Sequence, residues 1–178
     1  MLLADARESL KELPKDLITA QKLITNLSVN YTEPVAEAES TDYGAYIFSI
    51  NQLSVRYRIA KITPTKTGQF VTLWKRAGNG PIQPFDSSDD IDLFIISVRS
   101  GENFGQFIFP KNILQEKGII TTPNKEGKRA IRVYPPWDIT NSKQAKKTQQ
   151  WQIAYFLKMD AGQPIDYTRA NQLYGQTK

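Results

Sequence analysis

The 178-residue sequence contains no cysteine and no histidine. These absences exclude disulfides, zinc fingers, thiolate nucleophiles, serine–histidine dyads and histidine-based metal sites. Any catalysis must therefore use carboxylates, lysine, tyrosine, hydroxyl groups or a hard cation held by oxygen ligands.

Long hydrophobic runs are also missing. The longest apolar block is Leu93–Ile96, far shorter than the roughly 20 residues of a membrane span. The first acidic residue, Asp5, comes too early for the apolar core of a signal peptide. We therefore expect a soluble cytoplasmic protein that has no membrane partner.

The length and an apolar content of 40% fit a single domain with a real hydrophobic core. Helical spacing over residues 1–30, interrupted at Pro14, predicts an N-terminal helical cap in two pieces. Residues 30–42 are acidic and weakly patterned, which indicates a connector. We expect the α/β core to span residues 39–160.

Strand patterns dominate the core. Residues 93–98 are apolar on both faces, which predicts a central strand buried on each side and a sheet covered on two faces. Further strands are expected over 45–50, 53–62, 70–75, 106–109 and 129–134, and helices over 111–117 and 142–159. The sequence therefore predicts an α+β fold, with a mixed central sheet flanked by helices and a short capping tail after Gly162.

Side-chain alternation within residues 53–62 places two arginines together. Leu53, Val55, Tyr57 and Ile59 share one face, so Arg56 and Arg58 point to the other. Lys61 has the parity of the apolar face. This residue is interpreted either as an inward ammonium at the sheet edge or as a strand-end lysine that reaches back to water.

Positive charge is concentrated in two blocks. Residues 55–76 contain no acidic residue and carry Arg56, Arg58, Lys61, Lys66, Lys75 and Arg76. Residues 125–147 contain two acidic residues against Lys125, Lys128, Arg129, Arg132, Lys143, Lys146 and Lys147. Because aromatic residues and prolines are interleaved with these cations, the pattern favours a nucleic-acid surface over ordinary solubilising charge.

Two segments are candidate phosphate sites. Lys143, Lys146 and Lys147 lie in the first turns of the last predicted helix, where free N–H groups and ammonium groups would meet one anion. Asn141 or Ser142 is the expected cap of this helix. The loop Thr63–Gly68 offers hydroxyls and an ammonium but is no Walker loop. A solvated lysine face and an ordinary strand connection are the competing interpretations.

Carboxylates and aromatics supply two further candidates. Residues 86–92 carry four aspartates, but they lack the glycine and distant glutamate of a calcium loop, so a capped turn is favoured over a metal site. Trp137 adjoins a rigid Pro-Pro turn near Arg132 and is either a stacking platform for bases or a core residue.

Several motifs in order resemble the MepB-like family, over about residues 39–157. They are Glu39-Ser-x-Asp-Tyr, the run Ala60-Lys-Ile-Thr-Pro-Thr-Lys continuing to Arg76, Ile82-Gln-Pro-Phe-Asp86, Gly105-Gln-Phe-Ile-Phe-Pro-Lys111, Glu126-Gly-Lys-Arg129, Arg132-Val-Tyr-Pro-Pro-Trp-Asp138 and Trp151-Gln. Members are encoded near a multidrug efflux transporter and its repressor, and nucleic-acid binding has been proposed for them.

The resemblance also implies a sheet related to the PD-(D/E)XK nucleases. Such enzymes hold a divalent ion with an aspartate near one strand and with an acid two residues before a lysine on the next. Here Asp42 and Lys61 match two of these positions, but Ile59 stands where the acid belongs. The missing carboxylate implies binding without efficient cleavage. Glu39 remains a weak substitute, which keeps an Mg-dependent nuclease open as an alternative.

We therefore expect a nucleic-acid-binding protein, monomeric and without an obligate protein partner, whose ligand is DNA or RNA. No cofactor or metal is expected, except Mg under the nuclease alternative. A pocket for an anionic or phosphorylated small molecule around Lys61 and Lys66, and a protein-interaction role, also stay open. The candidate nucleic-acid contacts are Arg56, Arg58, Lys61, Lys66, Gln69, Lys75, Arg76, Lys128, Arg129, Arg132, Trp137, Lys143, Lys146 and Lys147.

Overall fold

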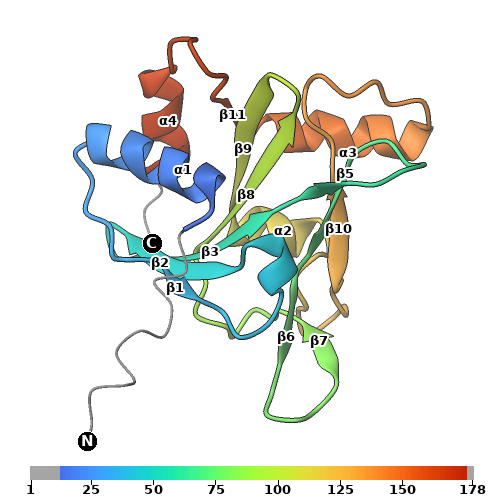
Figure 1. Cartoon of the computed structure of the whole chain (residues 1–178). Helices are drawn as coiled ribbons and strands as arrows, with labels where there is room; N and C mark the ends of the chain where they lie inside the picture. Colours follow the sequence, from blue (N-terminus) through green and yellow to red (C-terminus); the bar gives the residue numbers. More distant parts are fainter. Residues whose placement is uncertain (1–12, 176–178) are drawn as a thin grey trace, which may run out of the picture.

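The computed structural model describes residues 13–175, and its centre is a six-stranded sheet of order β1-β2-β3-β8-β9-β11 (Figure 1). These strands are β1 (Val35–Ala36), β2 (Tyr46–Ile50), β3 (Leu53–Ile59), β8 (Leu93–Ser100), β9 (Asn103–Pro110) and β11 (Phe156–Lys158). β3 and β8 run parallel, whereas the other neighbouring pairs are antiparallel. The predicted mixed central sheet of an α+β fold is therefore confirmed.

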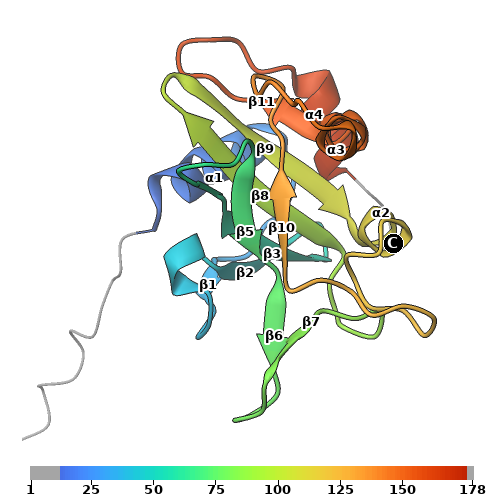
Figure 2. The same cartoon turned by 90° about the vertical axis from the view of Figure 1, so that its right-hand side faces the viewer.

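Two smaller sheets and four helices complete the described part of the chain. One sheet has the order β10-β5-β4, and the other is the β6–β7 ribbon, which projects from the body (Figure 2). The strands are β4 (Lys61–Ile62), β5 (Gln69–Thr72), β6 (Trp74–Arg76), β7 (Ile82–Pro84) and β10 (Ala130–Val133). The helices are α1 (Lys15–Asn26), α2 (Lys111–Glu116), α3 (Lys143–Ile153) and α4 (Tyr167–Tyr174), with a 3₁₀ turn η1 (Thr41–Tyr43).

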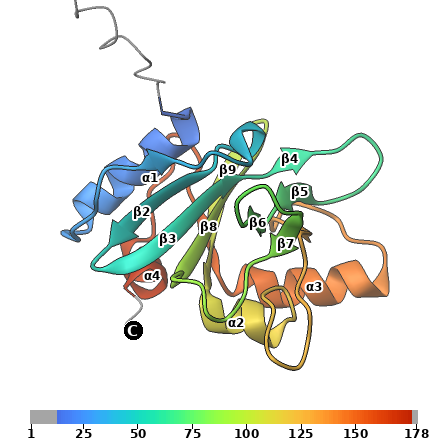
Figure 3. The same cartoon turned by 90° about the horizontal axis from the view of Figure 1, so that it is seen from below.

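β8 divides the hydrophobic core into two layers, because successive side chains of a strand point to opposite faces. Leu93 and Ile95 pack in the layer that includes α1 and α4, whereas Phe94, Ile96 and Val98 pack in the layer beneath β5, β10 and α2. Figure 3 shows α1 and α4 on one side of the central sheet and β5 and α3 on the other. The two-faced burial predicted for residues 93–98 is confirmed, although a small sheet provides much of the second cover.

Two strands that were predicted to be continuous are each interrupted in the structure. The strand expected over 53–62 breaks at Ala60, whose N–H still donates to the Ser97 carbonyl, and Lys61 then pairs with Phe70 in the other sheet. The strand expected over 70–75 breaks at Leu73, so that β5 and β6 belong to different sheets. The only local sign of the first break is Lys61, a cation at the parity of the apolar face, and strand propensity alone did not locate either break.

The C-terminal region also differs from the prediction. The helix expected to reach residue 159 ends at Ile153, and residues 156–158 form β11 beside β9. Gly105 explains this pairing, because a Cβ there would lie only 2.2 Å from the Phe156 ring. The expected tail contains α4, whose Tyr174 is buried and donates its hydroxyl to Gln106.

The N-terminal cap prediction holds for α1, which buries Leu17 and Ile24 against the central sheet. The first predicted helical piece, before Pro14, lies outside the described residues. The connector 30–42 contributes β1 and η1. None of the helices within residues 13–175 is long and apolar enough to cross a membrane.

Candidate functional site

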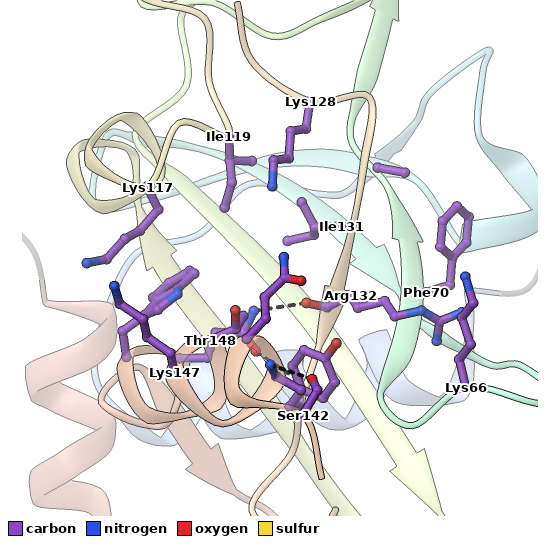
Figure 4. A pocket seen from close by; sticks show the side chains of 16 residues that line it. Lys66, Phe70, Lys117, Ile119, Lys128, Ile131, Arg132, Ser142, Lys147 and Thr148 are labelled. Atoms are coloured by element: carbon purple, nitrogen blue, oxygen red, sulfur yellow. Dashed lines mark hydrogen bonds between the residues drawn. The ribbon is translucent and has the colours of Figure 1, made fainter. Parts of the chain in front are cut away.

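A groove of about 510 Å³ lies between the β5–β10 sheet and α3. Five cations line it, namely Lys66, Lys117, Lys128, Arg132 and Lys147, and no carboxylate does so among the described residues. Three aromatic side chains, Phe70, Tyr134 and Trp151, line it as well. Figure 4 shows Lys66 and Phe70 on one side of the groove and Lys117 and Lys147 on the other.

A buried glutamine fixes α3 against β10. The Gln152 side chain accepts a hydrogen bond from the Tyr134 N–H at 2.8 Å and donates one to the Arg132 carbonyl at 3.0 Å. Both bonds go to the backbone of the segment that ends β10, so the amide continues the ladder of an edge strand. This clamp sets the separation between the two walls of the groove.

Arg132 anchors the loop that carries Lys66. Its guanidinium donates to Thr63 Oγ1 at 2.8 Å and to the Gly68 carbonyl at 3.2 Å, and it lies 5.9 Å from the Phe70 ring centre. Gly68 has a φ of +82°, and a Cβ there would lie 2.7 Å from the Tyr134 ring. The loop 63–68 is therefore held at both ends, which positions Lys66 at the groove.

The opposite end of the groove combines two lysines with a tryptophan. Lys117 Nζ lies 5.9 Å from the Trp151 ring centre and 3.0 Å from a Glu116 carboxylate oxygen. Lys147 is four residues before Trp151 on α3, so the two share one face of the helix. Trp151 also contacts the Phe109 ring, with the ring centres 5.3 Å apart. It therefore belongs both to the edge of the core and to the groove.

The three lysines at the start of α3 do not act as one cluster. Ser142 is the cap, and its hydroxyl accepts from the Ala145 N–H at 3.0 Å. Lys147 lines the groove, whereas Lys143 and Lys146 are exposed and lie outside its lining. The structure therefore separates one of these candidates from the other two.

Most cations of the first basic block have carboxylate partners. The Glu37 carboxylate pairs with Arg56, at 2.6 Å, and with Arg58. Arg58 is only 1% exposed, and burial lowers the pKa of its guanidinium, although Glu37 opposes this shift. Arg76 pairs with Glu39 at 2.8 Å. Arg56 and Arg58 share a face as predicted, but Arg58 is enclosed and does not offer its charge to a ligand.

The acidic turn 86–92 neutralises Lys75. The Lys75 ammonium lies 2.7 Å from Asp86 and 2.7 Å from Asp89. Hydrogen bonds from Lys75 and Ser88 hold the pKa of Asp86 well below its usual value. Within residues 13–175, no group of three or more acidic residues is arranged to hold a metal ion. The segment is a capped turn, as favoured from its composition.

Three further candidates are engaged in packing or pairing. Gln69 is 2% exposed and donates to the Arg99 carbonyl at 3.1 Å. Arg129 pairs with Glu126 at 3.1 Å. Trp137 packs edge-on against Phe156, with the ring centres 5.8 Å apart, so it is a partly buried residue at the edge of the core.

Of the expected nuclease-like positions, Asp42 lies in the 3₁₀ turn η1, and Ile59 and Lys61 lie beside that turn. Lys61 Nζ lies 4.6 Å from the Tyr43 ring centre, and a Cβ on Gly44 would meet the Ile59 side chain at 2.8 Å. The segment next to Asp42 therefore contacts both Ile59 and Lys61. Ile59 and Lys61 do not share one continuous strand, because the break at Ala60 separates them, so the parity argument for a common face fails.

A family model described as MepB-like matches residues 37–158. The chain belongs to the MepB-like family. The crystal structure of MepB is 37% identical, with a TM-score of 0.72, over 85% of this chain and 99% of that chain. The structure of a bacterial homing endonuclease, I-Ssp6803I, is 14% identical with a TM-score of 0.47, over 82% of this chain and 93% of that chain. No curated protein matches the chain.

Every residue that lines the groove falls within the MepB-like match. Four of the predicted contacts, Lys66, Lys128, Arg132 and Lys147, are brought together there. Sequence reasoning missed Lys117, which lies outside both basic blocks, and it did not assign Phe70 or Trp151 to the site. No local signal marks these residues, since the groove joins segments that are far apart in the MepB-like sequence.

Proposed function

We propose that the protein binds nucleic acid through the groove, as a cytoplasmic monomer and without efficient catalysis. The observation that carries the proposal is the groove's lining of five cations with no carboxylate among the described residues. Four cations of the first basic block, by contrast, have carboxylate partners, for example Glu37 beside Arg56. A polyanion would therefore find its most favourable potential in the groove.

The aromatic side chains favour a nucleic acid over a simple polyanion. Phe70, Tyr134 and Trp151 stand among the groove cations. Cations attract phosphates, and aromatic faces bind unstacked bases at about 1–3 kcal/mol each. Arg132 is largely occupied by the loop 63–68, so we assign phosphate contact chiefly to the four lysines.

A salt titration tests this proposal. The four lysines, with or without Arg132, would neutralise four to five phosphates, which predicts a slope of log K against log salt of about −3.5 to −4.5 on duplex DNA, measured by fluorescence anisotropy. The variant Lys66→Ala/Lys128→Ala/Lys147→Ala should weaken binding strongly and flatten the slope by about 3. Affinity that does not change between low and high salt would contradict the proposal.

The matched control removes the same charge elsewhere. Lys15, Lys22 and Lys158 are exposed and lie outside the groove lining. The variant Lys15→Ala/Lys22→Ala/Lys158→Ala should therefore keep most of the affinity at an identical net charge. Equal losses in the two triple variants would show that overall charge, not the groove, governs binding.

A phosphorylated small molecule is the alternative ligand, because the groove volume of about 510 Å³ lies within the usual range of ligand pockets, roughly 300–1,000 Å³. Of its two expected central residues, Lys66 lines the groove and Lys61 does not. Inorganic phosphate or a nucleoside monophosphate that bound as tightly as an oligonucleotide would favour this alternative.

We further propose that the central sheet is a degenerate PD-(D/E)XK nuclease-like core. The support is that the segment carrying Asp42 contacts Ile59 and Lys61, with an apolar side chain where an acid is needed. Incubation with plasmid and Mg or Mn should give no cleavage. Metal-dependent cleavage that is abolished in both Asp42→Ala and Lys61→Ala would establish the nuclease alternative instead.

A further inference from the structure

A second cavity of about 370 Å³ adjoins the groove. Its lining differs in chemistry from that of the groove, since it has one cation and one carboxylate, Lys66 and Asp138, together with Ile62, Trp137 and Ile139. Lys66 lines both cavities. The two spaces therefore share one lining residue, a lysine.

Exposed apolar side chains mark this second cavity. Ile62 is 62% exposed and Ile139 is 81% exposed, and both line it. Only three other large hydrophobic side chains of the described residues are exposed, and none of them lines this cavity or the groove. Two such side chains at one concave place indicate a surface that an apolar ligand group covers.

The position of the cavity is fixed by the fold. Ile62 pairs with Gln69 between β4 and β5, and Arg132 holds the intervening loop through Thr63 and the Gly68 carbonyl. Lys66 thus stands on a braced loop between the groove and the cavity. A ligand that places an anion on Lys66 has an apolar recess immediately beside that anion.

We propose that this cavity is a nucleobase subsite, which receives the base of a nucleotide whose phosphate is bound by Lys66. Bases that leave the stack are held between apolar or aromatic side chains with polar groups at their edges. Ile62 and Ile139 supply the apolar contacts, and Ser100, Thr67 and Asp138 supply polar groups in the same lining. This inference rests on the proposed function and assigns one further base to the cavity, beside the phosphates and bases bound in the groove.

The test compares two labelled single strands with the same number of phosphates, one with normal bases and one whose sugars carry no bases. Wild type should bind the base-bearing strand at least about fivefold more tightly. The variant Ile62→Ser/Ile139→Ser should reduce this ratio several-fold and leave the affinity for the base-free strand unchanged. Val35→Ser, a change at an exposed valine away from both cavities, should alter neither affinity.

Each outcome separates the inference from the proposed function. If the double variant keeps the wild-type ratio while both strands still bind with steep salt dependence, the subsite is refuted and the groove proposal stands. If neither strand binds to wild type, both proposals fail. If a nucleoside monophosphate displaces the strand at equal phosphate concentration, and only when Ile62 and Ile139 are intact, the subsite is supported and a free nucleotide replaces the polymer as its ligand.

Discussion

Replacing Gln152 with leucine tests whether one buried amide holds the groove together. The side chain bridges the Tyr134 N–H and the Arg132 carbonyl, and it is only 1% exposed. Leucine keeps the volume but leaves two backbone groups without these partners. Each unsatisfied group costs about 1–3 kcal/mol, and the apolar gain of leucine offsets part of the loss, so we expect destabilisation of about 2–4 kcal/mol.

For a chain of this size that loss corresponds to a fall in Tm of about 4–16 °C. Thermal unfolding followed by circular dichroism would measure it, with Gln150→Leu as the control, because Gln150 is exposed on the same helix. Nucleic-acid affinity should fall in parallel, since α3 would no longer be fixed to β10. A Tm for Gln152→Leu equal to that of Gln150→Leu would refute the clamp.

Three further changes probe the site and its surroundings. Gly68→Ala should lower the free energy of unfolding by about 1–3 kcal/mol, because φ is +82° and the new Cβ meets the Tyr134 ring; Gly78→Ala, in open space, should cost less. Lys143→Ala should raise the free energy of unfolding by a few tenths of a kcal/mol, up to about 1, since a cation at a helix start opposes the dipole. A large decrease in this free energy, measured by denaturant unfolding, would contradict the prediction. Asp86→Asn should lower the free energy of unfolding most above about pH 4 and progressively less as the pH falls below that value, because hydrogen bonds from Lys75 and Ser88 lower the pKa of Asp86 in the folded state. If the difference in free energy of unfolding between wild type and this variant were the same at pH 2 and pH 7, that linkage would be excluded.

The elements that were predictable from sequence are those with a local cause. Residues 93–98 are apolar at every position except Ser97, a pattern typical of a strand covered on both faces, and β8 confirms it. The spacing of Leu17, Ala20 and Ile24 suits one face of a helix, and α1 buries those residues. In both cases the pattern depends only on neighbours along the chain.

The features that were missed depend on contacts between distant segments. The alternation up to Ile59 is the same whether the strand continues or crosses into a second sheet, and the cation Lys61 at the next apolar position fits a strand end as well as a crossing. The strand β11 forms because Gly105 makes room for Phe156, a fit that neither segment shows alone. Arg58 is buried because Glu37 from the connector pairs with it, and the charge pattern of β3 gave no indication of that partner.

The same reasoning explains why charge blocks in the sequence are poor guides to a binding surface. The first block has six cations and no acid, yet four of them, Arg56, Arg58, Lys75 and Arg76, meet carboxylates from other segments. The groove instead collects five cations from both blocks and from α2's end. Taking these five from the 23 basic residues leaves 18, which equals the number of acidic residues. A variant lacking all five groove cations would therefore have a formal net charge of zero, and we expect it to lose both the long-range attraction of a polyanion and the site that binds it.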